Sequence, residues 1–261
     1  ALELLKEEPE VFVIGGGGSG AGGTFTIYGG KVDAHGSYSS GIGGGQSGAG
    51  GTIIINGGEV GSGGNIGSGY QYGPAGGSTV VINGGTVSVT GDNSNVGGNG
   101  STVEINGGEV KIAQGTLGVG YNGSNCNITI RGGTINSFCY YYPAVGGTAN
   151  NVKINIYGGS IKAESHSSDA IVATSVKVYP DAEKCERFTL KDFSGNELSD
   201  SPIIEEKNIT DILSENKQIQ IDYGFVHTFT GDYVDNNDGT HSRKCTGCGK
   251  VLDETEIYFE E

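Results

Sequence analysis

The sequence predicts an all-β protein whose main body is a right-handed parallel β-helix with three strands per coil and about seven coils. The first observation is a Gly-Gly pair that closes a short β-rich run six times, at intervals of 23 to 28 residues. The second is that aliphatic residues recur at fixed offsets from each pair. The third is composition: glycine provides 51 of the 261 residues without a triplet period, which excludes collagen and indicates corners between short strands.

Two aliphatic columns precede each glycine pair. The nearer column, two residues before the pair, contains Ile27, Ile55, Ile82, Ile105, Ile130 and Ile156, and the other contains Phe25, Ile53, Val80, Val103, Ile128 and Ile154. Period-2 spacing directs both side chains of a strand to one face, so these columns are expected to point inward and stack from coil to coil.

Two further columns predict the second and third strands of each coil. The second strand begins at Val32, Val60, Val87, Val110, Ile135 and Ile161, three residues after the first glycine of each pair. The third follows a variable loop and is expected at Ile14, Ile42, Ile66, Val96, Val119, Val145 and Ile171. Leucine-rich repeats and antiparallel sandwiches do not place like residues at these offsets.

Charge and composition divide the chain into four regions. Residues 1–10 are expected to form an N-terminal cap, with helical spacing of Leu2 and Leu5, and residues 11–180 the β-helix. Residues 181–224 lose the glycine period and are expected to cover the last coil or form a small β module, and residues 225–261 form a Cys/His knuckle module. Residues 181–261 hold nineteen of the 30 acidic residues and eight of the 15 basic ones, whereas the repeat region is nearly neutral.

This charge distribution argues against a nucleic-acid or anionic-membrane partner, because both require a basic surface. No apolar run approaches the roughly 18 residues that a membrane-spanning helix needs. The chain contains no methionine, which suggests a trimmed chain whose targeting segment lies upstream of Ala1.

The outward side chains beside the first corner form a candidate binding face. Tyr28, Asn56, Asn83 and Asn106 are expected to stand in one row beside outward-facing threonines. Such a face could bind a polysaccharide through hydroxyl hydrogen bonds and ring stacking. Alternatively, threonine is simply a good strand residue, and stacked asparagines satisfy backbone groups at the corner.

Tyrosines also gather in the variable loops beside the third strand. They include Tyr38, Tyr70, Tyr72, Tyr121 and Tyr141. Loops on a rigid scaffold are frequent recognition sites, and tyrosine loses little conformational entropy on binding. The other interpretation is that these rings pack over the glycine-rich third strand.

Catalytic residues are not evident in the repeat region. Glycoside hydrolysis requires two facing acids, and uronide lyase chemistry requires clustered carboxylates with a basic residue. The acids here lie mostly on separate coils and faces. Glu104 and Glu109, with Lys111 and Arg131 nearby, are better explained by surface ion pairs, so a non-enzymatic protein is expected.

The C-terminal motif Cys245-Thr246-Gly247-Cys248 has the form of a zinc knuckle. His227 and His241 could complete a Cys2His2 zinc site, with the turn at 237–239 bringing His241 back. A Cys245–Cys248 disulfide or two reduced thiols are the alternatives. The remaining cysteines, Cys126, Cys139 and Cys185, are interpreted as core or loop thiols.

The Gly-Gly corners, followed by Thr, Glu or Lys and then Val, together with the Ile-Gly-Gly-Gly third strand, resemble secreted or surface bacterial proteins of the pectate-lyase-like β-helix superfamily. The resemblance covers residues 11–180 and is closer to non-catalytic, carbohydrate-binding members, because the lyase calcium cluster has no counterpart. The segment from His227 to Gly249 resembles Cys/His repeats of bacterial surface proteins, although the usual closing histidine is missing. The resemblance implies an extracellular or cell-surface location.

Three hypotheses for function follow. The first is a non-catalytic surface module that binds a polysaccharide, or a cell-surface glycan or protein, through the flat β-helix face and the tyrosine-rich loops. The second is a structural subunit that self-associates through the β-helix ends into fibres. The third is a divergent polysaccharide lyase.

Overall fold

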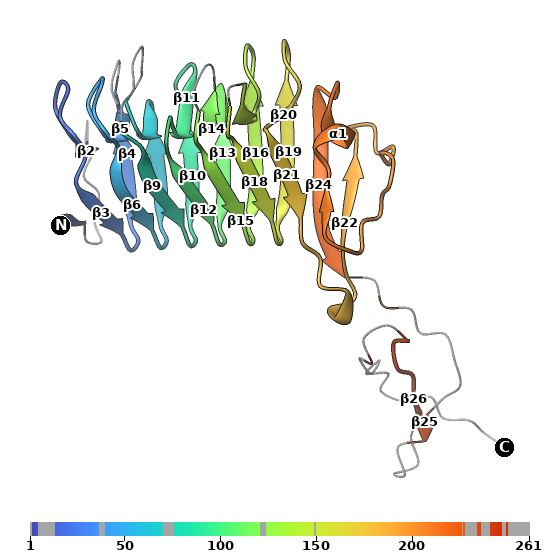
Figure 1. Cartoon of the computed structure of the whole chain (residues 1–261). Coiled ribbons are helices and arrows are strands. Elements are labelled where there is room, and N and C mark those ends of the chain that lie inside the picture. Colours follow the sequence, from blue (N-terminus) through green and yellow to red (C-terminus); the bar gives the residue numbers. More distant parts are fainter. Residues whose placement is uncertain are drawn as a thin grey trace.

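The computed structural model describes residues 2–4, 14–36, 40–69, 76–120, 124–148, 150–225, 227, 234–235, 241–246 and 249. Figure 1 shows a rod of stacked coils that runs from the N-terminus to an orange cap, with the C-terminal segment beyond it. The fold is an all-β parallel solenoid whose coils each contribute one strand to each of three sheets, so the predicted fold class is confirmed.

Three long sheets run along the rod, and we call them sheets A, B and C. Sheet A contains β1 (Leu2–Leu4), β3 (Thr24–Ile27), β6 (Gly51–Ile55), β9 (Ser78–Ile82), β12 (Thr102–Ile105), β15 (Asn127–Ile130), β18 (Lys153–Ile156), β21 (Ser175–Val178) and β23 (Lys207–Asn208). Sheet B contains β4 (Lys31–Ala34), β7 (Glu59–Ser62), β10 (Thr86–Val89), β13 (Glu109–Ile112), β16 (Thr134–Cys139), β19 (Ser160–Ser165), β24 (Gln218–Phe225) and β22 (Glu186–Lys191). Sheet C contains β2 (Ile14–Gly15), β5 (Ser40–Gly43), β8 (Asn65–Gly67), β11 (Ser94–Gly97), β14 (Gly115–Gly120), β17 (Val145–Gly147) and β20 (Ile171–Val172).

The predicted aliphatic columns form the core. Ile27 pairs with Ile55, which pairs with Ile82, and the same column continues to Ile156 in sheet A. The column that begins at Val32 runs in register through sheet B. Because like side chains stack at every coil, the interior is a continuous column made mainly of Ile and Val.

Three details of the expected fold are wrong. About six turns are present, from β3 to β20, instead of about seven. In sheet C, Leu117 and not Val119 pairs with Val96, because β14 is six residues long and its pairing with β17 shifts at Gly118 and Gly120. The third detail is the helical spacing expected at Leu2, because Leu2–Leu4 instead form the strand β1, which extends sheet A in parallel with β3.

Glycine is required both at the corners and within sheet C. Gly58, the second glycine of its pair, has a φ of 88°, which lies in the left-handed region that glycine adopts most readily. Gly43 has a φ of 132°, and a Cβ atom there would lie 2.1 Å from the carbonyl oxygen of Gly67 on the next coil. The coils therefore approach so closely in sheet C that a side chain at this position cannot be accommodated.

Antiparallel strands close the C-terminal end of the rod. β24 pairs antiparallel with β19 and then with β22, which continues sheet B, while β23 pairs antiparallel with β21 of sheet A. The short helices η1 (Ala182–Lys184) and α1 (Thr210–Leu213) connect these strands. We call residues 181–225 the cap; its buried side chains, such as Phe188 and Ile219, join the solenoid core.

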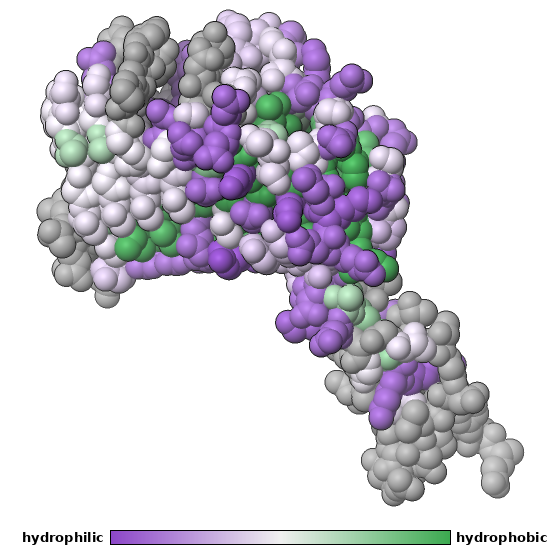
Figure 2. Space-filling model, in the orientation of Figure 1, coloured by the Kyte–Doolittle hydropathy of each residue, from purple (hydrophilic) through white to green (hydrophobic). Residues whose placement is uncertain are grey.

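A two-stranded ribbon lies beyond the cap. It consists of β25 (Val234–Asp235) and β26 (His241–Ser242), which pair antiparallel. Figure 2 shows that the visible face is pale over the N-terminal half of the rod and becomes a mixture of hydrophilic and hydrophobic groups over the C-terminal half and the cap. None of the helices in the described part of the chain is long and apolar enough to cross a membrane.

Candidate functional site

The first candidate site is the row of side chains at the corner between sheets A and B. The Asn83 amide Nδ2 donates to Asn56 Oδ1 over 2.7 Å, and Asn106 Nδ2 donates to Asn83 Oδ1 over 2.8 Å. These predicted binding residues therefore form a ladder along the rod. Tyr28, at the N-terminal end of the row, exposes 58 % of its surface.

Stacked rings continue this row toward the cap. The Arg131 guanidinium lies over the Tyr157 ring, 5.3 Å from its centroid, and the opposite neighbour, Tyr179, stacks on Tyr157 at 4.5 Å with an interplanar angle of 10°. Arg131 also pairs with Glu104 at 2.8 Å. Because neighbouring coils cover the ring of Tyr157, this stretch stabilises coil stacking and offers little ring face to a ligand.

A hollow lies at the other end of the sheet B strands, where they turn toward sheet C. It has a volume of about 230 Å³ and is lined by Asp92, Asn93, Gln114, Tyr140 and Tyr141. Tyr141, one of the predicted binding residues, exposes 61 % of its surface. We call this the tyrosine hollow.

Successive coils position the residues of the tyrosine hollow. Asn93 follows β10, Gln114 follows β13 and the tyrosines follow β16, so the stacking of coils places these connections side by side. The backbone N–H of Asn93, in the left-handed region with a φ of 56°, donates to the carbonyl of Gln114 over 2.7 Å. The register that aligns the core therefore also sets the spacing of these polar groups.

Ring contacts fix the tyrosine pair. The Tyr140 ring stacks on His166 of the next coil at 4.4 Å and meets the Tyr141 ring edge to face at 4.8 Å. Tyr140 is thereby held from one side, and Tyr141 extends from it into solvent. The other tyrosines predicted to bind in the loops, Tyr38, Tyr70, Tyr72 and Tyr121, lie outside the described residues.

A second hollow lies on the outer face of sheet B, next to the first. It has a volume of about 330 Å³, and two phenylalanines from different regions, Phe138 of β16 and Phe193 of the cap, contribute to its lining. Ala113 lines this hollow and Gln114 lines the tyrosine hollow. The two hollows therefore follow one another along β13 and β16, and we call the second one the phenylalanine hollow.

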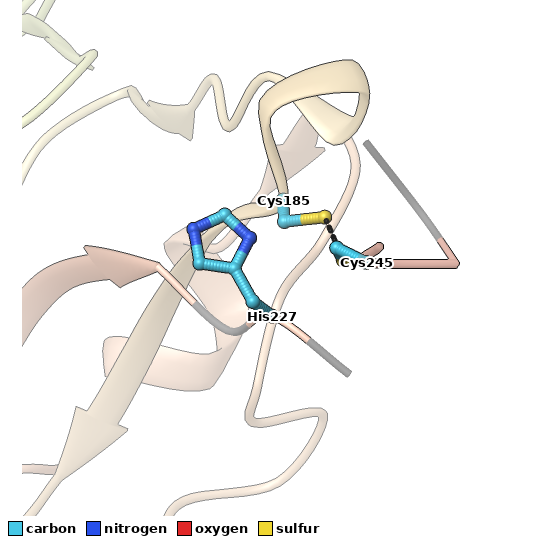
Figure 3. A group of neighbouring side chains, drawn as sticks. All are labelled: Cys185, His227 and Cys245. Atoms are coloured by element: carbon cyan, nitrogen blue, oxygen red, sulfur yellow. Dashed lines mark hydrogen bonds between the residues drawn. The ribbon is translucent and has the colours of Figure 1, made fainter. Parts of the chain in front are cut away.

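The second candidate site is a group of three side chains that could hold a metal ion, where Cys185 of the cap meets His227 and Cys245. Figure 3 shows Cys185, His227 and Cys245 facing one another. Their ligand atoms all lie within 4.8 Å of one another, and the two Sγ atoms are 3.4 Å apart. This separation is longer than a disulfide bond of about 2.05 Å and close to the roughly 3.7 Å between two thiolates on a tetrahedral zinc ion.

Antiparallel pairing explains how Cys185 joins this group. Glu186 at the start of β22 pairs with Phe225 at the end of β24, so the residues just outside this pair, Cys185 and His227, come together. Cys185 ends η1 in the left-handed region with a φ of 57°. The interpretation of Cys185 as a core or loop thiol agrees with its position in a turn, but it left Cys185 out of the candidate metal group because only parallel columns were considered.

The predicted zinc ligands are only partly located. His227 and Cys245 belong to the group, and the Gly249 N–H donates to the Cys245 carbonyl over 2.9 Å. His241 lies in β26, but its side chain, like all of Cys248, is outside the described part of the chain.

Several acids of the solenoid form local ion pairs. Glu109 pairs with Lys111 at 2.9 Å and Asp33 approaches His35 at 3.4 Å, and all four side chains are well exposed.

Comparison with protein-family models, curated proteins and solved structures finds no match for this chain. The parallel β-solenoid is therefore established by the structure, while membership of the pectate-lyase-like superfamily and the likeness to Cys/His surface repeats remain expectations.

Proposed function

We propose that this protein is a non-catalytic glycan-binding module of an extracellular surface protein, and that the tyrosine hollow is its binding site. The observation that carries the proposal is the exposed Tyr141 ring beside one carboxylate and two amides, from Asp92, Asn93 and Gln114. Aromatic rings present a flat apolar surface to the C–H groups of a sugar. Carboxylate and amide oxygens accept hydrogen bonds from its hydroxyl groups, and amide nitrogens donate to them.

The phenylalanine hollow suits an elongated glycan. It continues the tyrosine hollow along β13 and β16, and it adds two phenylalanine rings, Phe138 and Phe193, and the amide of Asn136 on β16. A chain of several sugar units could therefore contact both hollows at once. Rigid, preformed surfaces of this kind bind without a large ordering cost.

The acid content of the hollow favours binding over hydrolysis. Asp92 is the single acid among the described lining residues of the tyrosine hollow, and Glu164 of the phenylalanine hollow accepts a hydrogen bond from Gln218 Nε2 over 2.9 Å. Glycoside hydrolysis ordinarily uses two carboxyl groups about 5 to 9.5 Å apart. Binding of a sugar requires only hydrogen-bonding groups and a ring surface, and the residues that line the tyrosine hollow supply both.

Binding of a panel of plant, microbial and host oligosaccharides to the intact chain, screened on an array and measured by calorimetry, tests this proposal. We expect Tyr141→Ala to weaken binding at least tenfold. Tyr28→Ala is the matched control, because Tyr28 is equally exposed but stands in the row at the opposite end of the sheet B strands. Equal loss in both variants, or sugar cleavage by the wild type, would contradict the proposal.

We also propose that Cys185, His227 and Cys245 bind zinc. Two thiolates and an imidazole are a common zinc donor set, and a fourth position would be completed by Cys248, as the Cys-x-x-Cys spacing suggests, or by water. The ion would tie residues from the cap to the segment that contains β26. Metal analysis after purification without chelators should find about one zinc per chain, and Cys185→Ser should lose it, with Cys139→Ser as the control.

A further inference from the structure

We infer that Cys185 and Cys245 are a reversible disulfide pair, so that the C-terminal segment can be joined covalently to the cap. The two Sγ atoms are 3.4 Å apart although the residues are 60 positions apart in the chain. The sulfur atoms need to approach by little more than an ångström to reach bonding distance. This pairing differs from the Cys245–Cys248 bond that the sequence spacing suggests.

Burial separates Cys185 from the other described cysteines, including its partner Cys245, which is 3 % exposed. Cys185 is half-buried at the exposed end of the cap, where a small oxidant can reach it. Cys126 and Cys139 are enclosed in the solenoid with 0 % and 1 % exposure. Burial also raises the pKa of the Cys126 thiol to about 12, which keeps it protonated and unreactive near neutral pH.

A low-molecular-weight disulfide would supply the oxidising equivalents. One thiolate attacks a sulfur of the small disulfide and releases one small thiol, and the second cysteine then displaces the other. In sum, two cysteine thiols and one small disulfide give one Cys185–Cys245 bond and two small thiols, so both protons and both electrons are accounted for. The chain loses two hydrogen atoms.

The bond and the proposed zinc ion exclude each other. Each thiolate has to leave the metal before its sulfur can join the other sulfur, so formation of the bond would release the ion. This part of the inference rests on the proposed zinc site, whereas formation of the bond in metal-free protein does not. The tether between cap and C-terminal segment would persist in both states, held by metal in one and by a covalent bond in the other.

Peptide mapping under non-reducing conditions tests the pairing. Metal-free full-length protein is incubated with glutathione disulfide, trapped with an alkylating agent and digested. We expect a Cys185–Cys245 peptide in the wild type and in Cys248→Ser, none in Cys185→Ser, and its loss on reduction with dithiothreitol. A Cys245–Cys248 peptide as the main wild-type product, or no bond involving Cys185, would overturn the inference.

A second measurement separates this inference from the zinc proposal. Protein loaded with one equivalent of zinc is oxidised in the presence of a chromogenic chelator. We expect zinc release in step with formation of the Cys185–Cys245 peptide. If the chain binds no zinc, the metal proposal fails while the mapping still decides the disulfide; bond formation with zinc retained would overturn their mutual exclusion.

Discussion

The solenoid body and the cap are both built from β-strands, but their strands pair in different directions. In the body, each strand pairs in parallel with its equivalent on the next coil, so position in the repeat determines its neighbours. In the cap, β22 and β24 pair antiparallel, and the neighbours are residues far apart in sequence with no repeat relation. The comparison shows that repetition encodes the body, whereas the cap depends on several antiparallel pairings without a repeat, and its cysteine group on the pairing of β22 with β24.

The largest effect is expected from a side chain placed between coils of sheet C. Gly43→Val should abolish folding or cost about 4 kcal/mol or more, because its Cβ would overlap the Gly67 carbonyl and its φ of 132° disfavours a branched residue. Gly17→Ala is the control, since a Cβ there meets nothing within 4 Å. Chemical denaturation followed by circular dichroism measures both. Equal stability of the two variants would refute the close stacking of sheet C.

A cavity in the cap should affect the cap more than the body. Phe188→Ala removes the largest fully buried side chain and should lower the free energy of unfolding by about 3–5 kcal/mol. Hydrogen exchange should reveal this loss in residues 186–225 before residues 53–130. Phe193→Ala, at a cap position with 41 % exposure, is expected to change stability little. Simultaneous loss of protection along the whole rod would show that cap and body unfold as one unit.

The body could be predicted from the sequence far better than the cap. The columns through Ile27 and Val32 and the glycine corners follow from period-2 strands and backbone sterics, which are local properties. Val119 was misplaced because strand length and register shifts in sheet C leave no local signal. Cys185 was missed because proximity to His227 arises only from the β22–β24 register.

The asparagine ladder should contribute modestly to the body. Asn83→Ala removes one amide that donates to Asn56 and accepts from Asn106, and because the ladder is exposed we expect a loss of about 1 kcal/mol. A double-mutant cycle with Asn56→Ala, measured by urea denaturation, isolates the coupling between neighbouring amides. A coupling energy of zero would mean that the ladder is incidental to stacking.

The effect that is smallest near neutral pH concerns the Cys126 thiol. Burial raises its pKa from 9.0 to about 12, so the unfolded chain gives up this proton at a lower pH than the folded chain. Its contribution to stability is therefore complete below about pH 9 and declines as the pH rises from there toward 12. Mass spectrometry after alkylation at pH 8 should find Cys126 unmodified in folded protein and modified in urea. Rapid labelling of folded protein would contradict its enclosure in the core.

Distances between equivalent positions on different coils test the central claim most directly. Spin labels on non-natural residues at position 24 and at 102, 127 or 153, measured by pulsed electron resonance, report the separation of outward sites three, four and five coils apart along sheet A. We expect each added coil to lengthen the distance by about 4.8 Å. Distances that shorten or alternate from one site to the next would contradict a parallel stack of coils.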